Sequence, residues 1–301
     1  MRQTTVRKSV KTSGIGLHSG KKVNLTFNPA PENTGIVFRR TDKNGFPIKA
    51  DIRYVSKLAY ATNLTRDGVS IATTEHLMAT LIGLGIDNVY LDIDAEEVPI
   101  MDGSASAFVY LIKEAGIKKL KAPKKFMKIL KPKHYLNGDR RISVYPYDGF
   151  KITYTIEFDH PLIRLQTRTL ELKTPEDFEN EVSPARTFGF LKDVEMLRKN
   201  GLALGGSLEN AIVIDSDKIL NSHLRFADEF VRHKILDVIG DLALLGYPLL
   251  GHVVAYKAGH EIHTSLAKEI VADSSCYEIV TMGEQEERVS VPQTAEEPSL
   301  S

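Results

Sequence analysis

The chain has 301 residues, 42% of them hydrophobic and 26% charged, which is typical of a folded globular protein and excludes a disordered one. It carries 39 basic and 39 acidic residues, so the formal net charge is zero and no global basic field favours nucleic acid. The single cysteine, Cys276, excludes an intrachain disulfide and a cysteine-rich zinc site and favours a reducing compartment, so any metal must use the nine histidines or the carboxylates.

The first half of the chain predicts strands, turns and two helices. Residues 13–20 contain three glycines and predict a tight turn, in which His18 has no acidic neighbour and is expected to be structural. A helix is expected from Thr73 or Thr74, either of which can cap it, to about Gly83. The other expected elements are strands at 23–27, 36–38 and 89–93, a turn at 99–104 and a helix at 105–114.

Residues 118–133 hold eight lysines and two prolines and are interpreted as a linker between two domains. Only Phe126 supplies an aromatic ring there, so a solvated linker is favoured over a nucleic-acid patch. Beyond Gly283 the chain is rich in glutamate, serine and proline without periodicity, which predicts disorder. The expected division is an N-terminal domain at 1–122, a C-terminal domain at 123–282 and a disordered tail at 283–301.

The second half repeats the pattern of strands and helices. The expected strands are 142–145, 151–156, 211–214 and 253–256, with a loop at 182–190, a Gly-rich connection at 201–207, and helices at 193–199, 230–242 and 260–271. In each half a histidine near a helix start is followed by an apolar helix, a Gly-rich turn and a strand. This faint duplication predicts an α+β fold of two similar units, each with a sheet covered by helices.

Neither a signal peptide nor a membrane span is predicted. Residues 1–13 are polar and basic and lack an apolar stretch. The longest apolar run, at 242–254, is interrupted by glycine, proline and histidine and is too short to cross a bilayer. We therefore expect a cytoplasmic protein that does not span a membrane.

His233, Asp237 and Asp241 recur every fourth residue in the expected helix at 230–242. At about 100° per residue they fall on one stripe roughly 80° wide. A histidine and an aspartate one turn apart can bind a single cation, because their side chains lie on the same face. The segment alone leaves open the alternative of a solvated polar face.

Glu75 and His76, at the start of the first long helix, add an imidazole and a second carboxylate. Two histidines and an aspartate with an open fourth position form the ligand set of catalytic zinc, and Glu75 could then take a proton from water. Two unrelated buried or capping histidines are the alternative. A non-haem iron oxygenase uses similar ligands but leaves Glu75 without a role, so hydrolysis is favoured.

His260 follows Gly259 at a strand-to-helix turn, where an imidazole can be exposed. A carboxylate near an imidazole raises its pKa and holds its tautomer, so a pair of Asp241 and His260 would serve as the general acid of an amide hydrolysis. A surface histidine at a helix N-terminus is the alternative that the sequence leaves open.

Eight short segments occur together, in order and with ordinary gaps, between about residue 3 and residue 280. They are Gly14-Ile15-Gly16-Leu17-His18-Ser19-Gly20, Thr74-Glu75-His76-Leu77, Gly83-Leu84-Gly85-Ile86-Asp87-Asn88, Pro99-Ile100-Met101-Asp102-Gly103-Ser104, Ala185-Arg186-Thr187-Phe188-Gly189-Phe190, Gly205-Gly206-Ser207, Arg232-His233-Lys234-x-x-Asp237-x-x-Gly240-Asp241-Leu242 and Gly259-His260. With these segments the chain resembles the UDP-3-O-acyl-N-acetylglucosamine deacetylases, the zinc amidases that commit Gram-negative bacteria to lipid A.

The resemblance implies two β-α-α-β sandwich domains with the active site between them. It implies that Zn²⁺ is held by His76, His233 and Asp237. Glu75 would be the general base, and His260, oriented by Asp241, the general acid.

The resemblance also implies roles around the substrate. Thr187 would stabilise the oxyanion through its hydroxyl, and Lys234 would contact the charged part of the substrate. Phe188 and residues 202–207, Gly206 among them, would border an apolar passage for the acyl chain. The turn at 158–161 would lie near the nucleotide. The chain departs from the family pattern at His263, one turn after His260, which could crowd or tune the acid.

The implied reaction is hydrolysis of the N-acetyl group of UDP-3-O-acyl-N-acetylglucosamine with release of acetate, the committed step of lipid A biosynthesis. The expected partner is therefore a small-molecule substrate, and the expected state is a monomer. Two alternatives stay open: a zinc amidase that acts on another acylated amino sugar, and a non-catalytic module that binds an acylated nucleotide sugar.

Overall fold

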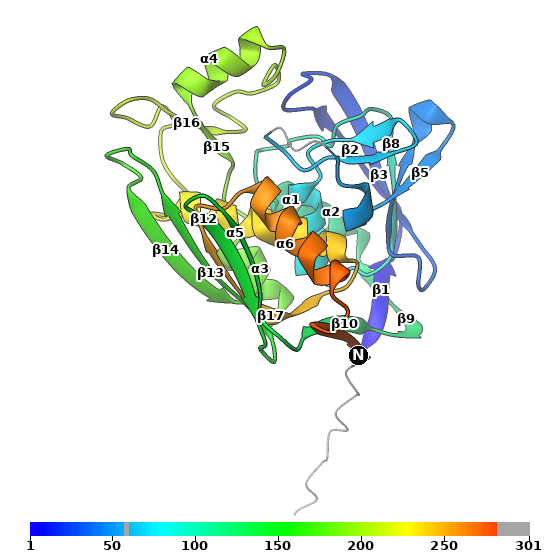
Figure 1. Ribbon diagram of the computed structural model, residues 1–301. Helices are drawn as coiled ribbons and strands as arrows, with labels where there is room; N and C mark the ends of the chain where they lie inside the picture. Colours follow the sequence, from blue (N-terminus) through cyan, green and yellow to red (C-terminus); the bar gives the residue numbers. More distant parts are fainter. Residues whose placement is uncertain (57–59, 282–301) are drawn as a thin grey trace, which may run out of the picture.

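Two β-sheets enclose a double layer of helices in the computed structural model, which describes residues 1–56 and 60–281. Figure 1 shows β2, β3, β5 and β8 on one side, β12, β13, β14 and β17 on the other, and α1, α2, α5 and α6 between them. The layers run sheet, helix, helix, sheet. The predicted α+β class is confirmed, while the division into domains at 122/123 stays a prediction.

The first sheet has the strand order β2-β3-β8-β4-β5. Its members are β2 (Val10–Ile15), β3 (Lys22–Pro29), β4 (Ile36–Arg40), β5 (Phe46–Lys49) and β8 (Val89–Ile93). Burial alternates along β3, so its apolar residues face the helices α1 (Glu75–Gly83) and α2 (Ser106–Ala115). The rings of Phe27 on β3 and Phe108 on α2 lie 6.4 Å apart, which ties sheet to helix.

The second sheet is built around β17, which pairs with β10, β12 and β13. Its members are β10 (Lys125–Ile129), β11 (Lys133–Asn137), β12 (Arg140–Tyr145), β13 (Phe150–Glu157), β14 (Leu165–Glu171), β17 (Leu249–Tyr256) and β18 (Tyr277–Thr281). The helices α5 (Glu229–Leu242) and α6 (His260–Ala272) lie on its inner side (Figure 1). The helices predicted at 230–242 and 260–271 each differ from the observed helix by one residue at one end.

The two helical layers meet where α1 packs against α5. Gly240 makes the close approach possible, because a Cβ on it would lie 2.0 Å from the carbonyl oxygen of Glu75. The start of α1 is thereby held against the polar stripe of α5. In this way residues more than 150 positions apart come to share one site.

Shorter elements complete the fold. They are the pairs β1 (Arg2–Val6) with β9 (Ile117–Pro123), β6 (Leu64–Arg66) with β7 (Val69–Ile71) and β15 (Phe188–Phe190) with β16 (Ile212–Ile214), the helices α3 (Pro175–Glu181) and α4 (Leu191–Lys199), and the 3-10 turns η1 (Thr41–Lys43), η2 (Ile52–Tyr54) and η3 (Ala243–Leu245). Figure 1 shows α4, β15 and β16 at one end of the layers. No helix in the described part of the chain is long and apolar enough to cross a membrane.

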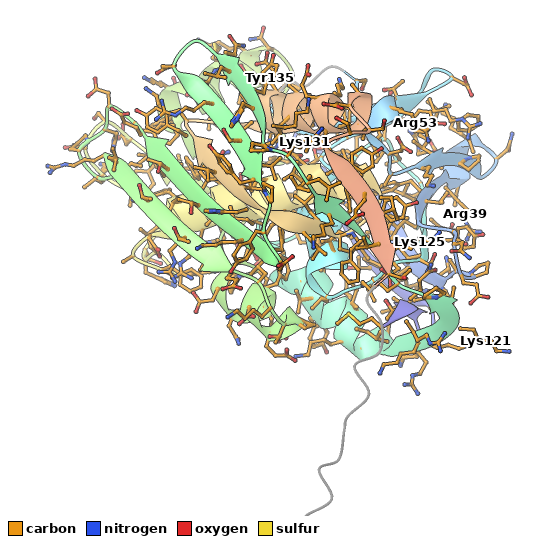
Figure 2. The ribbon with its side chains drawn as sticks, turned by 60° about the horizontal axis from the view of Figure 1, so that its bottom comes forward. Arg39, Arg53, Lys121, Lys125, Lys131 and Tyr135 are labelled. Atoms are coloured by element: carbon orange, nitrogen blue, oxygen red, sulfur yellow. The ribbon has the colours of Figure 1, made fainter. Side chains whose placement is uncertain are left out.

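Two segments contain more strand than the sequence predicted. Most of the lysine-rich segment 118–133 is strand, because β9 pairs with β1 while β10 pairs with β17 and β18. Its strands are satisfied by backbone pairing, and Lys121, Lys125 and Lys131 are exposed (Figure 2), whereas Lys124 is largely buried and forms an ion pair with Asp87 at 2.9 Å. Part of the expected loop at 182–190 is strand β15, which pairs in parallel with β16. The expected disordered tail at 283–301 lies outside the described residues.

Candidate active site

The polar stripe of α5 is buried and faces the other helices. His233, Asp237 and Asp241 all lie on this stripe, and Glu229 extends it by one turn toward the N-terminus. Each of the four side chains is at most 2% exposed. Burial of four such groups rules out the solvated polar face that the sequence left open, since polar groups away from water need partners.

His76, His233 and Asp237 form a cluster that fits a metal ion. The Nε2 atoms of His76 and His233 lie 3.7 and 3.3 Å from Asp237 Oδ1. One ligand atom from each residue lies within 4.8 Å of the other two. Asp237 Oδ1 is buried and accepts no hydrogen bond from the described residues. An orphaned carboxylate oxygen facing two imidazole nitrogens is the environment that a cation completes.

The charges in this cluster suit a cation as well. Burial lowers the pKa of His76 to about 3 and lowers that of His233, so both imidazoles are neutral and offer a lone pair. Burial opposes ionisation of Asp237, but Lys234 and the histidines hold its pKa well below the usual range. Two neutral imidazoles and one carboxylate are the protonation states that metal binding requires.

The ligands are oriented by groups outside the cluster. His233 Nδ1 donates to the carbonyl of Ala185 at 3.1 Å, which leaves Nε2 free for a metal. Lys234 Nζ donates to Asp237 Oδ2 at 2.8 Å, which leaves Oδ1 directed at the two imidazoles. The sequence did not reveal this role of Lys234, because it depends on the rotamer of a flexible side chain.

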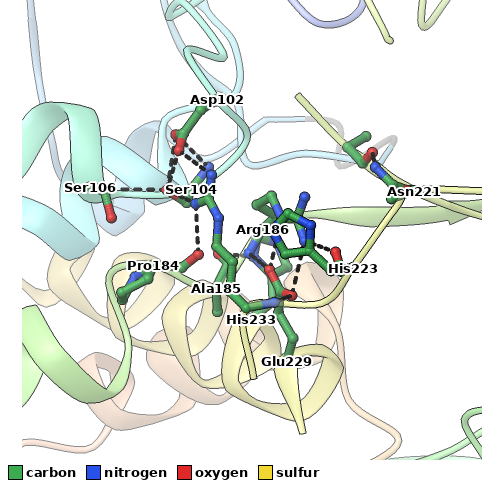
Figure 3. Close-up of polar contacts among 12 residues, drawn as sticks. Asp102, Ser104, Ser106, Pro184, Ala185, Arg186, Asn221, His223, Glu229 and His233 are labelled. Carbon is green, nitrogen blue, oxygen red and sulfur yellow. Dashed lines mark hydrogen bonds and ion pairs between the residues drawn. The ribbon is translucent and has the colours of Figure 1, made fainter. Parts of the chain in front are cut away.

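The segment that carries Ala185 is itself clamped in place (Figure 3). Arg186 donates from its backbone N and from Nε to Glu229 Oε1, at 3.0 and 2.9 Å. Arg225 forms an ion pair with Asp102 at 2.9 Å and donates to the carbonyl of Pro184 at 2.9 Å. Segment 184–186 is thus held between α5 and the turn at 99–104, which belongs to the first half of the chain.

Thr187 follows directly and lines the site cavity. Its backbone N donates to the carbonyl of Gly103 at 2.8 Å. Gly103 has φ +81°, and a Cβ there would lie 2.0 Å from the carbonyl oxygen of Asn210, so only glycine fits. The Asp-Gly turn therefore holds Thr187 in the wall of the cavity that the cluster also lines.

Glu75 and His260 face each other on the other side. Glu75 Oε2 accepts the backbone N–H of Thr62 at 3.0 Å, and its Oε1 lies 3.8 Å from His260 Nε2. His260 Nδ1 donates to Asp241 Oδ2 at 2.8 Å, so the structure brings together the pair that the sequence suggested. Burial raises the pKa of Glu75 to about 7. Burial opposes protonation of His260, but Asp241 and Glu75 raise its pKa to about 10.

A cavity of about 560 Å³ opens onto these groups. Phe188, Gly206 and Lys234, expected to contact substrate, all lie in its wall, together with His18. Away from the cluster the wall is largely apolar and comes from α4, β15, β16 and the loops beside them: Leu191, Val194, Leu197, Ala203, Leu208, Val213 and Leu220. The cavity thus has a polar end and an apolar end.

Sequence reasoning missed Thr62 and Glu229. Glu229 lies one turn before His233, so the spacing of the stripe could have pointed to it. Nothing in the sequence marks Thr62, which donates its backbone N–H to Glu75 and its hydroxyl to Asp241. His18, expected to be structural, lines the cavity, and both of its ring nitrogens are buried without a hydrogen bond from the described residues.

Comparison with known proteins identifies the family. The sequence model of LpxC, described as UDP-3-O-acyl N-acetylglycosamine deacetylase, matches residues 3–272. The chain belongs to the LpxC family. The family match covers the first sheet, the second sheet apart from β18 and every residue of the cluster, and it confirms the resemblance inferred from the eight segments.

Curated members of the LpxC family resemble the chain over nearly its whole length. A protein of Myxococcus xanthus is 51% identical over 280 residues, which cover 92% of this chain and 89% of the relative. A protein of Thermodesulfovibrio yellowstonii is 49% identical over 277 residues, which cover 92% of this chain and 94% of the relative. One of Pseudomonas entomophila is 48% identical over 283 residues, 93% of each chain. All three are named UDP-3-O-acyl-N-acetylglucosamine deacetylase.

Proposed function

We propose that the protein hydrolyses the N-acetyl group of UDP-3-O-acyl-N-acetylglucosamine and releases acetate, the committed step of lipid A biosynthesis. The observation that carries the proposal is the convergence of a metal-ligand cluster, a carboxylate and a carboxylate–imidazole pair on one cavity with an apolar end. Membership of the LpxC family supports the same reaction and substrate.

His76, His233 and Asp237 would hold a zinc ion. Two imidazoles and one carboxylate with an open position form the usual donor set of catalytic zinc. When bound, zinc supplies Lewis acidity and lowers the pKa of a water molecule at the site to about 7. The orphaned Asp237 Oδ1 is the structural sign that these residues fit the ion.

Glu75 acts as the general base. As a carboxylate it takes a proton from the water that attacks the amide carbon, and its pKa of about 7 matches this task near neutral pH. The hydroxyl of Thr187 donates a hydrogen bond to the carbonyl oxygen as negative charge develops there. Both groups line the same cavity, on different elements.

His260 acts as the general acid. Asp241 accepts from Nδ1, so the acidic proton sits on Nε2, which faces the cavity near Glu75. His260 gives this proton to the amine nitrogen as the carbon–nitrogen bond breaks, and acetate and the free amino sugar result. Its pKa of about 10 keeps the imidazole protonated at neutral pH.

The two ends of the cavity bind different parts of the substrate. The apolar wall of α4, β15 and β16, with Phe188 and Gly206, takes the acyl chain. Lys234 stands at the polar end, with Nζ 5.5 Å from the Phe188 ring centre, and contacts the charged part of the substrate. The proposal needs no residue from a second subunit and keeps the expected monomer, while the cytoplasmic location stays a prediction.

Metal analysis coupled to a deacetylase assay tests the proposal. The purified protein is expected to hold about one zinc per chain and to release acetate from the acylated UDP-sugar. His233→Ala is expected to lose the metal and the activity, whereas His134→Ala, at an exposed position on β11, should keep both.

Two results would overturn the proposal. Absence of bound zinc from the wild-type protein would rule out the metal centre. Binding of the substrate without release of acetate would identify the protein as a binding module. Equal rates on acylated amino sugars with and without the UDP group would assign the enzyme to a different substrate.

A further inference from the structure

His263 contacts the same carboxylate oxygen as the acid. It lies on α6 one turn after His260 and is completely buried. Its Nδ1 lies 2.8 Å from Asp241 Oδ2, the same distance as His260 Nδ1. A carboxylate only accepts hydrogen bonds, so both imidazoles donate to this one oxygen. Nothing in the reaction described above uses His263.

Asp241 is therefore held by three donors. Its Oδ1 accepts the hydroxyl of Thr62, which precedes α1, while its Oδ2 accepts from both histidines of α6. The carboxylate cannot rotate about its Cβ–Cγ bond without breaking one of these bonds. Removing His263 takes away one of the two donors to Asp241 Oδ2, the oxygen that also accepts from the general acid His260.

The far side of the His263 ring is fixed by the second sheet. The hydroxyl of Tyr154 on β13 lies 2.9 Å from Nε2 and 2.7 Å from the carbonyl oxygen of Ala258, and its one hydrogen bonds either of these two acceptors. Tyr154 is also fully buried, and the two rings meet edge to face with centroids 5.8 Å apart. A chain of contacts thus runs from the sheet through His263 to Asp241 and His260.

We propose that His263 is a positioning residue of the reaction: it holds the Asp241 carboxylate at the angle that keeps His260 Nδ1 bonded and His260 Nε2 directed at the cavity. Its effect on rate rests on the proposed function. Being buried beneath Asp241, His263 acts through Asp241 and His260 and does not touch substrate.

Two variants at one position separate positioning from packing. His263→Leu fills the space but donates nothing, whereas the side-chain amide of His263→Asn can still donate to Asp241 Oδ2. We expect His263→Leu to lower kcat by about 10- to 100-fold, the usual cost of losing a group that orients a reactive one. KM should stay within about twofold, because no contact to the substrate is lost. His263→Asn should recover most of the loss, and both variants should keep their zinc.

A second readout does not depend on activity. In proton NMR of the zinc-loaded enzyme, a histidine N–H bonded to a carboxylate gives a resolved signal far downfield, and His260→Gln assigns the His260 Nδ1 proton. We expect this signal to shift or broaden in His263→Leu and to persist in His263→Asn. If the wild type has no deacetylase activity, the proposed function fails, while the NMR comparison still tests the positioning.

The proposal is overturned if folded His263→Leu keeps both kcat and the His260 signal. It is equally overturned if His263→Asn and His263→Leu lose kcat to the same extent, since loss of packing alone would then explain the effect. Should His263→Leu not fold, Tyr154→Phe takes its place, because it removes the other anchor of the ring. An unchanged kcat and His260 signal in Tyr154→Phe would then count against the proposal.

Discussion

Asp237 uses its two carboxylate oxygens for different purposes. Oδ2 accepts from Lys234, while Oδ1 has no donor among the described residues and faces two neutral imidazoles. Glu75 and His260 show a similar division of labour. Their environments push the pKa of Glu75 to about 7 and that of His260 to about 10, so one is available as a base and the other as an acid.

The rate is expected to follow a bell-shaped pH profile. Turnover needs Glu75 as a carboxylate, so it falls as the pH drops below the pKa of Glu75, about 7. It also needs His260 as an imidazolium, so it falls as the pH rises above the pKa of His260, about 10. A bound cation favours the carboxylate form of Glu75 and disfavours the imidazolium form of His260, so it lowers both pKa values. Both limbs of the profile are therefore expected at or below these pH values.

Glu75→Gln is the control for the acidic limb. It should keep zinc, lose turnover by about 10²- to 10⁴-fold and leave a residual rate without that limb. Steady-state kinetics between pH 5 and 11 with zinc analysis of both proteins measures this. An acidic limb that survives in Glu75→Gln would assign the base to another group.

At the scale of the element, α5 carries one functional group per turn. Glu229 fixes the segment at 184–186, His233 and Asp237 form the metal cluster with His76, and Asp241 holds the acid. Each partner comes from a different element, so the helix acts as the common support of the site. α5 can support the whole site only because α1 lies close enough for Glu75 and His76 to reach its polar stripe.

Gly240→Ala is expected to separate the two helices. A Cβ there would lie 2.0 Å from the carbonyl oxygen of Glu75 and 2.7 Å from its carbon, so the backbone must move. The free energy of unfolding should fall by about 1–3 kcal/mol, as for other overpacked interiors. The displacement of Glu75 should also lower kcat, by up to about 100-fold for a shift near 1 Å.

Gly259→Ala provides the matched control. Within residues 1–56 and 60–281 nothing lies within 4 Å of a Cβ at this position, and its backbone is extended. Urea unfolding and kcat of the two variants make the comparison. Equal stability of Gly240→Ala and the wild type would show that the approach of α1 to α5 tolerates a methyl group.

At the scale of the whole molecule, the site joins the two halves of the chain. The proposed metal ligands come from α1 in the first half and α5 in the second. The ion pair of Asp102 and Arg225 also links the halves, through the turn that supports Thr187. A bound ion would therefore tie the two helical layers together and should bind the unfolded chain weakly.

Removal of the metal is expected to destabilise the protein. A ligand present at about 1,000 times its Kd stabilises the folded state by about 4 kcal/mol. Chelation should therefore lower the Tm measured by calorimetry, and added zinc should restore both the Tm and the activity. His233→Ala should show no such response to zinc. A wild-type Tm that is insensitive to chelation and to zinc would contradict a tight metal site between the layers.

Local patterns predicted some elements well and missed others. The helix at 230–242 was predicted to within one residue of α5, because its apolar spacing is a local property. Helix α3 was missed, although Thr174 and Asp177 form a capping box around Pro175 that the sequence displays. The lysine-rich strand β9 was taken for a linker, since its strand pairing with β1 is a long-range contact.

The sequence by itself determined the types of the site residues, the helices that carry His76, His233 and His260, and the spacing of the stripe. Only the tertiary structure decided that no described residue donates to Asp237 Oδ1, that Lys234 donates to Oδ2 and that Asp241 is shared by two histidines. It also decided the pKa values of Glu75 and His260. The physical reason is that periodicity is a property of neighbouring residues, whereas burial, hydrogen-bond partners and pKa values depend on how distant segments pack.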